Sequence, residues 1–116
     1  MQVIFHDVQR SQWIEDYIAD RAARLDRFAS GITSCRVTLA REQASHHKGN
    51  RYSVLVEVRL PPQHDLAVRK QKDIHDLQQL PALINLAFGA VERQLKKTAE
   101  PRRHEEKNRD GLPPAA

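Results

Sequence analysis

This chain of 116 residues has a single cysteine, four glycines and one tryptophan, and aromatic residues make up only 5% of it. One thiol excludes a disulfide scaffold and a zinc site built from cysteines, and four glycines exclude a collagen-like repeat. No apolar run approaches the roughly 20 residues that a membrane-spanning helix requires. The first ten residues, MQVIFHDVQR, show no basic segment followed by an apolar one, so a secretory signal is not expected. These absences predict one small cytoplasmic domain without a membrane contact.

Positive charge is concentrated in the first 97 residues. The chain carries 19 Lys and Arg against 15 Asp and Glu, a formal net charge of +4. Basic and acidic residues balance after Lys97, so the whole excess belongs to residues 1–97, and a polarised basic domain favours an anionic partner. From Thr98 the sequence is charged, contains proline and has few apolar residues. We therefore expect a folded domain over residues 1–97 and a disordered charged tail over residues 98–116.

Hydrophobic periodicity predicts four strands and two helices. The strands are expected at residues 2–6, 34–42, 51–60 and 66–69, with a turn at 45–50 and a polar connection over 71–79. The first helix is expected to begin after Ser11 and to end before Gly31, with Trp13 and Tyr17 reinforcing its buried face. The second is expected to begin at Pro81 and to bury a regular apolar stripe: Leu80, Leu83, Ile84, Ala87, Phe88, Val91 and Leu95.

The resulting order, β-α-β-β-β-α, predicts an α+β fold. Each helix has one apolar stripe, and the simplest way to bury both is to pack the two helices on one face of a four-stranded sheet. The opposite sheet face would then remain in water, which explains the polar residues Arg51, Ser53 and Glu57 in the third strand.

Two helical segments resemble a known family. Residues 19–28, ADRAARLDRF, resemble the first-helix signature of the ribosome hibernation-promoting factors and ribosome-associated inhibitors (sigma-54 modulation proteins), which tends to read A-x-(K/R)-x-x-K-L-E-(K/R)-aromatic. Residues 92–97, ERQLKK, resemble the end of that family's second helix. The family has the same β-α-β-β-β-α order, which is similar to that of double-stranded RNA-binding domains. The resemblance spans residues 1–97 and is to the short form, with divergence at residues 74–82, IHDLQQLPA.

This resemblance implies a monomeric protein that binds the ribosomal RNA of the small ribosomal subunit, in the channel for messenger and transfer RNA, and inhibits translation during stress or stationary phase. Folded ribosomal RNA is read mainly through phosphate, 2′-OH and shape, which requires positioned cations. A first cluster, Arg21, Arg24 and Arg27, is expected on the outer side of the first helix, and a second cluster, Arg93, Lys96 and Lys97, at the end of the second helix. If the helices are parallel, the two clusters are expected to align into one ridge. The residues expected to contact RNA are Arg21, Arg24, Arg27, Arg69, Lys70, Arg93, Lys96 and Lys97.

Two other functions remain open from the residues themselves: an adaptor for structured RNA unrelated to hibernation, and a protein-interaction module that uses the exposed sheet face or an edge strand. An enzyme is not expected, because no paired carboxylates or glycine-rich phosphate loop occur and Cys35 alternates with core residues. No cofactor, small-molecule substrate or metal is expected, since the adjacent His46 and His47 chelate only weakly. Trp13 lies at core spacing, so a base-stacking platform is not expected either.

Overall fold

The computed structural model describes residues 1–42, 50–62 and 64–111, with the side chains of these residues described as far as Lys97 except that of His64. Most of the turn expected at residues 45–50 therefore lies outside the described residues. The strands are β1 (Gln2–His6), β2 (Ser34–Glu42), β3 (Asn50–Leu60) and β4 (His64–Ile74). The helices are α1 (Gln12–Ala23), α2 (Leu80–Gly111) and the two short 3-10 helices η1 (Arg24–Arg27) and η2 (Leu77–Gln79).

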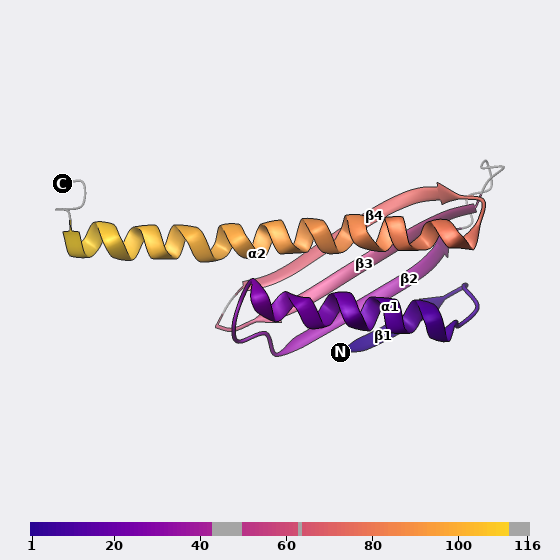
Figure 1. Ribbon diagram of the computed structural model, residues 1–116, viewed down its shortest axis with the longest axis horizontal. Coiled ribbons are helices and arrows are strands. Elements are labelled where there is room, and N and C mark those ends of the chain that lie inside the picture. The colour runs from indigo at the N-terminus through magenta and orange to yellow at the C-terminus, as the bar shows by residue number, and fades with distance from the viewer. Residues whose placement is uncertain (43–49, 63, 112–116) are drawn as a thin grey trace.

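The four strands form one mixed sheet in the order β1-β2-β3-β4. β1 and β2 are parallel, so the chain between them must cross over the sheet, and α1 provides that crossover. β2, β3 and β4 follow as an antiparallel meander. Both helices lie on the same face of the sheet and run in the same direction (Figure 1). The predicted α+β fold and helix placement are confirmed.

The core lies between this sheet face and the two helices. Alternate residues of β3 point into it, including Val54, Val56 and Val58, which are at most 2% exposed. α2 contributes the largest fully buried side chain, Phe88, and all seven residues of its predicted stripe are buried. Burying a side chain of this size contributes roughly 1.5–3 kcal/mol, so this stripe holds α2 on the sheet.

The first helix differs from its prediction at its end and at Trp13. The α-helical part ends at Ala23 and continues as η1, and Gly31 follows with a φ of +88°, a conformation that glycine adopts without strain. Ile14 and Ile18 are buried as predicted, but Trp13 is 50% exposed. The expectation that Trp13 reinforces the buried face is therefore wrong. Trp13 precedes Ile14 by one residue, about 100° round the helix, which places it beyond the edge of the stripe.

The fourth strand is much longer than predicted. β4 extends to Ile74, so residues 71–74 belong to the sheet and not to a polar connection. Lys70 and Lys72 alternate with Gln71 and Asp73, a pattern without apolar periodicity. Such a strand is stable because β4 is an edge strand, where lysines keep their charged ends in water. Ile74 is 1% exposed and joins the core at the strand's end.

The second helix begins one residue earlier than predicted and continues beyond its predicted end. Asp76 and Gln79 form a capping box at η2, which leads directly into Leu80. α2 then runs without a break to Gly111, although residues from Thr98 onward were expected to form a disordered tail. In Figure 1 this C-terminal part projects beyond the sheet. Extending an existing helix is far easier than starting one, but Pro101 lies in this stretch and lacks the amide that a helix interior uses. The disordered tail over residues 98–116 stays a prediction.

Candidate nucleic-acid interface

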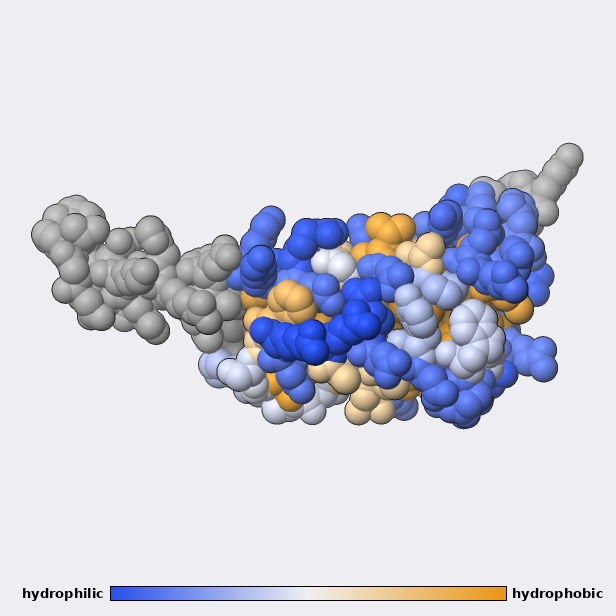
Figure 2. Space-filling model, viewed as in Figure 1, coloured by the Kyte–Doolittle hydropathy of each residue, from blue (hydrophilic) through white to orange (hydrophobic). Residues whose placement is uncertain are grey.

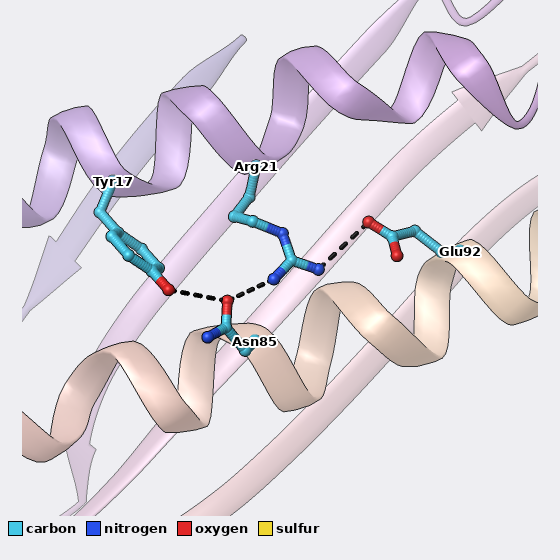
Figure 3. Close-up of polar contacts among 4 residues, drawn as sticks. All are labelled: Tyr17, Arg21, Asn85 and Glu92. Carbon is cyan, nitrogen blue, oxygen red and sulfur yellow. Dashed lines mark hydrogen bonds and ion pairs between the residues drawn. The ribbon is translucent and has the colours of Figure 1, made fainter.

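A polar cluster joins the facing sides of the two helices. The Tyr17 hydroxyl donates to Asn85 Oδ1 at 2.9 Å, and the Arg21 guanidinium donates to the same oxygen. Arg21 Nη2 also lies 3.1 Å from Glu92 Oε2. Figure 3 shows the two side chains of α1 pointing toward the two of α2 across the gap between the helices. These contacts fix the position of α1 relative to α2.

Arg21 is therefore a structural residue of the helix pair. Its side chain is only 14% exposed, and its guanidinium carbon lies 5.7 Å from the centre of the Phe88 ring. Nε is buried and has no hydrogen-bond partner among the described residues. The expectation that Arg21 points outward from α1 is wrong, because a residue three positions after Ile18 lies about 60° from it, within reach of the neighbouring helix. The Glu92 carboxylate offsets the positive charge of the Arg21 guanidinium.

The remaining cations of the first cluster are exposed. Arg24 and Arg27 both belong to η1, and residues three apart in a 3-10 helix lie on the same side. Neither forms an ion pair with any side chain that the structure describes. The three-residue spacing of Arg24 and Arg27 already predicts that they lie on one side of the chain. In a 3-10 helix, with three residues per turn, the two side chains align more closely than they would in an α-helix.

The second cluster lies near the middle of α2, beside the end of α1. Arg93, Lys96 and Lys97 are exposed, and within the described side chains none of them has an ion-pair partner. The two helices are parallel and Arg21 of α1 contacts Glu92 of α2, so the end of α1 and this part of α2 lie at the same level, side by side (Figure 1). Figure 2 shows strongly hydrophilic side chains gathered over both helices on this face. We call the five exposed cations of these two clusters the helix ridge: Arg24, Arg27, Arg93, Lys96 and Lys97.

The two expected cations of β4 do not join the helix ridge as a pair. Neighbouring residues of a strand point to opposite faces of the sheet. Lys70 is partly buried and lies opposite Val54, on the side that carries the helices. Arg69 lies on the open sheet face, where its guanidinium pairs with Glu42. The structure therefore separates Arg69 from the ridge.

The open sheet face carries charges that largely offset one another. Arg51 Nε lies 3.3 Å from Asp73 Oδ1, and Arg59 Nε lies 3.9 Å from Asp65 Oδ1. Arg36 lies opposite Glu57 in the register of β2 and β3. A face on which cations and anions alternate in this way attracts a polyanion much less than the helix ridge does.

The described residues offer little that suits catalysis or metal binding. Cys35 is buried, and desolvation raises the pKa of its thiol, so the nucleophilic thiolate is disfavoured. The described residues contain no group of three or more His, Cys, Asp or Glu side chains placed to hold a metal ion. His46 and His47 lie outside the described residues. None of the described helices is both long enough and apolar enough to cross a membrane.

Comparisons with solved structures find the same fold. The N-terminal domain of Protein Y from Thermus thermophilus superposes with a TM-score of 0.61 at 22% identity, covering 84% of this chain and 94% of that one. A ribosomal subunit interface protein from Coxiella burnetii gives a TM-score of 0.61 at 15% identity, covering 86% of this chain and 99% of that one. No curated protein sequence gives a significant match.

A sequence model of one protein family matches residues 1–103, nearly the whole chain. This match includes both helical segments on which the resemblance was based, ADRAARLDRF and ERQLKK, and so confirms it. The chain belongs to the sigma 54 modulation protein / S30EA ribosomal protein family.

Proposed function

We propose that this protein binds the ribosomal RNA of the small ribosomal subunit through the helix ridge. There it occupies the channel for messenger and transfer RNA and inhibits translation during stress or stationary phase. The family to which the chain belongs and the names of its structural neighbours, Protein Y and a ribosomal subunit interface protein, support a ribosomal partner. The proposal includes action in the cytoplasm, by occupancy and without catalysis.

The observation that carries the proposal is the helix ridge itself. Five exposed cations lie at one level of the helix pair, at the end of α1 and beside it on α2, and the described side chains contain no ion-pair partner for any of them. Side chains of this kind can contact phosphates without first breaking an internal salt bridge. The open sheet face differs, because three of its arginines already have carboxylate partners. We therefore propose Arg24, Arg27, Arg93, Lys96 and Lys97 as RNA contacts, with Lys70 at the flank of α2, and Arg69 as a more distant one.

The test is sedimentation of the tagged protein with ribosomes from resting and growing cells. We expect the protein to sediment with small subunits, and to do so despite excess duplex RNA. Release by duplex RNA would instead indicate an adaptor for structured RNA. Binding that is unaffected by high salt would contradict phosphate contacts and would indicate a protein partner. Inhibition of a cell-free translation reaction should rise with the fraction of small subunits bound.

A further inference from the structure

Trp13, the only tryptophan of the chain, lies on the same side of α1 as residues of the interface described above. Residues four apart in a helix are neighbours on one face, so Trp13 lies beside Tyr17, one turn earlier. The Tyr17 hydroxyl donates a hydrogen bond to Asn85 of α2, which shows that this side of α1 faces α2. Arg24 follows Tyr17 by seven residues and returns to the same side. Trp13, Tyr17 and the ridge residue Arg24 therefore lie in a row along one side of α1 and its continuation η1.

The exposure of Trp13 is not explained by the packing of this chain. The indole is 50% exposed, whereas Tyr17 is only partly exposed and is fixed through its hydroxyl. Tryptophan is highly buried on average, so an indole half in water on a charged helix is less ordinary than an exposed leucine. Large flat aromatic side chains in such positions are enriched where one protein surface contacts another molecule.

We propose that Trp13 stacks on an unpaired nucleobase of the bound RNA. This inference rests on the proposed function and adds to it a contact that reads the base and not the phosphate. A partner that meets both the indole and the neighbouring cations must combine flat apolar faces with negative charge, which is the chemistry of an unpaired RNA strand. The distance from Trp13 to Arg24 suits a short stretch of such a strand. Trp13 and Arg24 are separated by eleven residues, about 16 Å of helix, which is roughly the length of five stacked nucleotides.

The test compares three variants of Trp13 for affinity to purified small subunits. Trp13→Phe keeps an aromatic face, Trp13→Leu keeps apolar area without one, and Trp13→Ala removes both. We expect Trp13→Ala and Trp13→Leu each to weaken binding by about fivefold or more, the lower end for loss of one stacked base. Trp13→Phe should retain most of the affinity. Leu77→Ala, at a similarly exposed apolar residue in η2, is the matched control and should bind like the wild type.

Salt dependence separates stacking from phosphate contact. None of the Trp13 variants removes a cation, so the slope of log affinity against log salt concentration should remain that of the wild type. Full affinity of Trp13→Ala would overturn the stacking contact, and full affinity of Trp13→Leu would show an apolar contact with ribosomal protein instead. In both cases wild-type binding to the subunit remains, so the proposed function stands. Failure of the wild type to bind small subunits would overturn both proposals.

Discussion

Reversing one cation on each helix of the ridge, with Arg24→Glu and Lys96→Glu combined, is expected to weaken binding to the small subunit without unfolding the protein. Each phosphate contact contributes about 0.7–0.9 to the slope of log affinity against log salt concentration, so loss of two should flatten the slope by about 1.4–1.8. A charge-assisted contact at an exposed site contributes on the order of 1 kcal/mol, so the double variant should bind about 30-fold more weakly. Affinity is measured by sedimentation with purified small subunits at four or five salt concentrations.

Stability decides whether a loss of binding is informative. Arg24 and Lys96 are exposed and lie off the apolar stripes, so each substitution should change the free energy of unfolding by at most about 0.5 kcal/mol, roughly 2–4 °C in the thermal midpoint. Arg41→Glu with Lys72→Glu is a matched control, because both residues are exposed, are not ion-paired to any described side chain and face each other across Tyr52, away from the ridge. This control should keep the wild-type affinity.

One result would refute the reasoning. If Arg51→Glu with Arg59→Glu, on the open sheet face, abolished binding while the ridge variant bound normally, then the RNA would lie on the opposite side of the sheet. The ridge would then be a solvated helix surface.

Removal of residues 101–116 should leave the thermal midpoint of unfolding unchanged, since the predicted domain ends at Lys97, and a truncated protein that unfolds would place the boundary later. Arg21→Ala should lower the free energy of unfolding by about 2 kcal/mol, because it leaves the part-buried Glu92 carboxylate unpaired, and Glu92→Leu in the same chain should restore part of that loss in a thermal melt. Burial raises the pKa of the Cys35 thiol, so the stability that the neutral thiol contributes is fully present at neutral pH and is lost as pH rises above the unfolded value of about 9. In urea titrations, the free energy of unfolding of Cys35→Ala should therefore decline less at high pH than that of the wild type. A chelator should change neither the thermal midpoint nor subunit binding, and stoichiometric zinc in the purified protein would contradict the expected absence of a metal.

Periodicity predicts the core well because burial leaves a regular trace in the sequence. The stripe of α2 repeats at helical spacing, and Val54, Val56 and Val58 alternate, so both elements could be placed against the sheet's covered face. β4 could not be delimited in this way. Its second half is an edge strand that carries lysines at alternate positions, and its sequence resembles a polar loop.

At the candidate site, prediction from the sequence fails for a different reason. Spacing gives the angle of a side chain round its helix, but not the position of the neighbouring helix. Arg21 and Arg24 are three residues apart, yet one packs against α2 and the other faces water. The signal that could have separated them is the pair Asn85 and Glu92, seven residues apart on one side of α2, which provides acceptors for a buried guanidinium. The expectation for Trp13 fails for a different reason, because its angle of about 100° from Ile14 already places it at the margin of the stripe.

The lysine-bearing edge of β4 has a consequence for self-association. An eleven-residue edge strand exposes unpaired backbone groups along its length and could pair with the same strand of a second copy. A two-fold antiparallel pairing centred near Arg69 would bring Arg69 and Lys70 of one copy close to the same side chains of the other. Their mutual repulsion opposes the extension of the sheet from one molecule to the next. Open sheet edges pair more readily as the protein concentration rises, so the repulsion between these side chains favours separate molecules over an extended sheet.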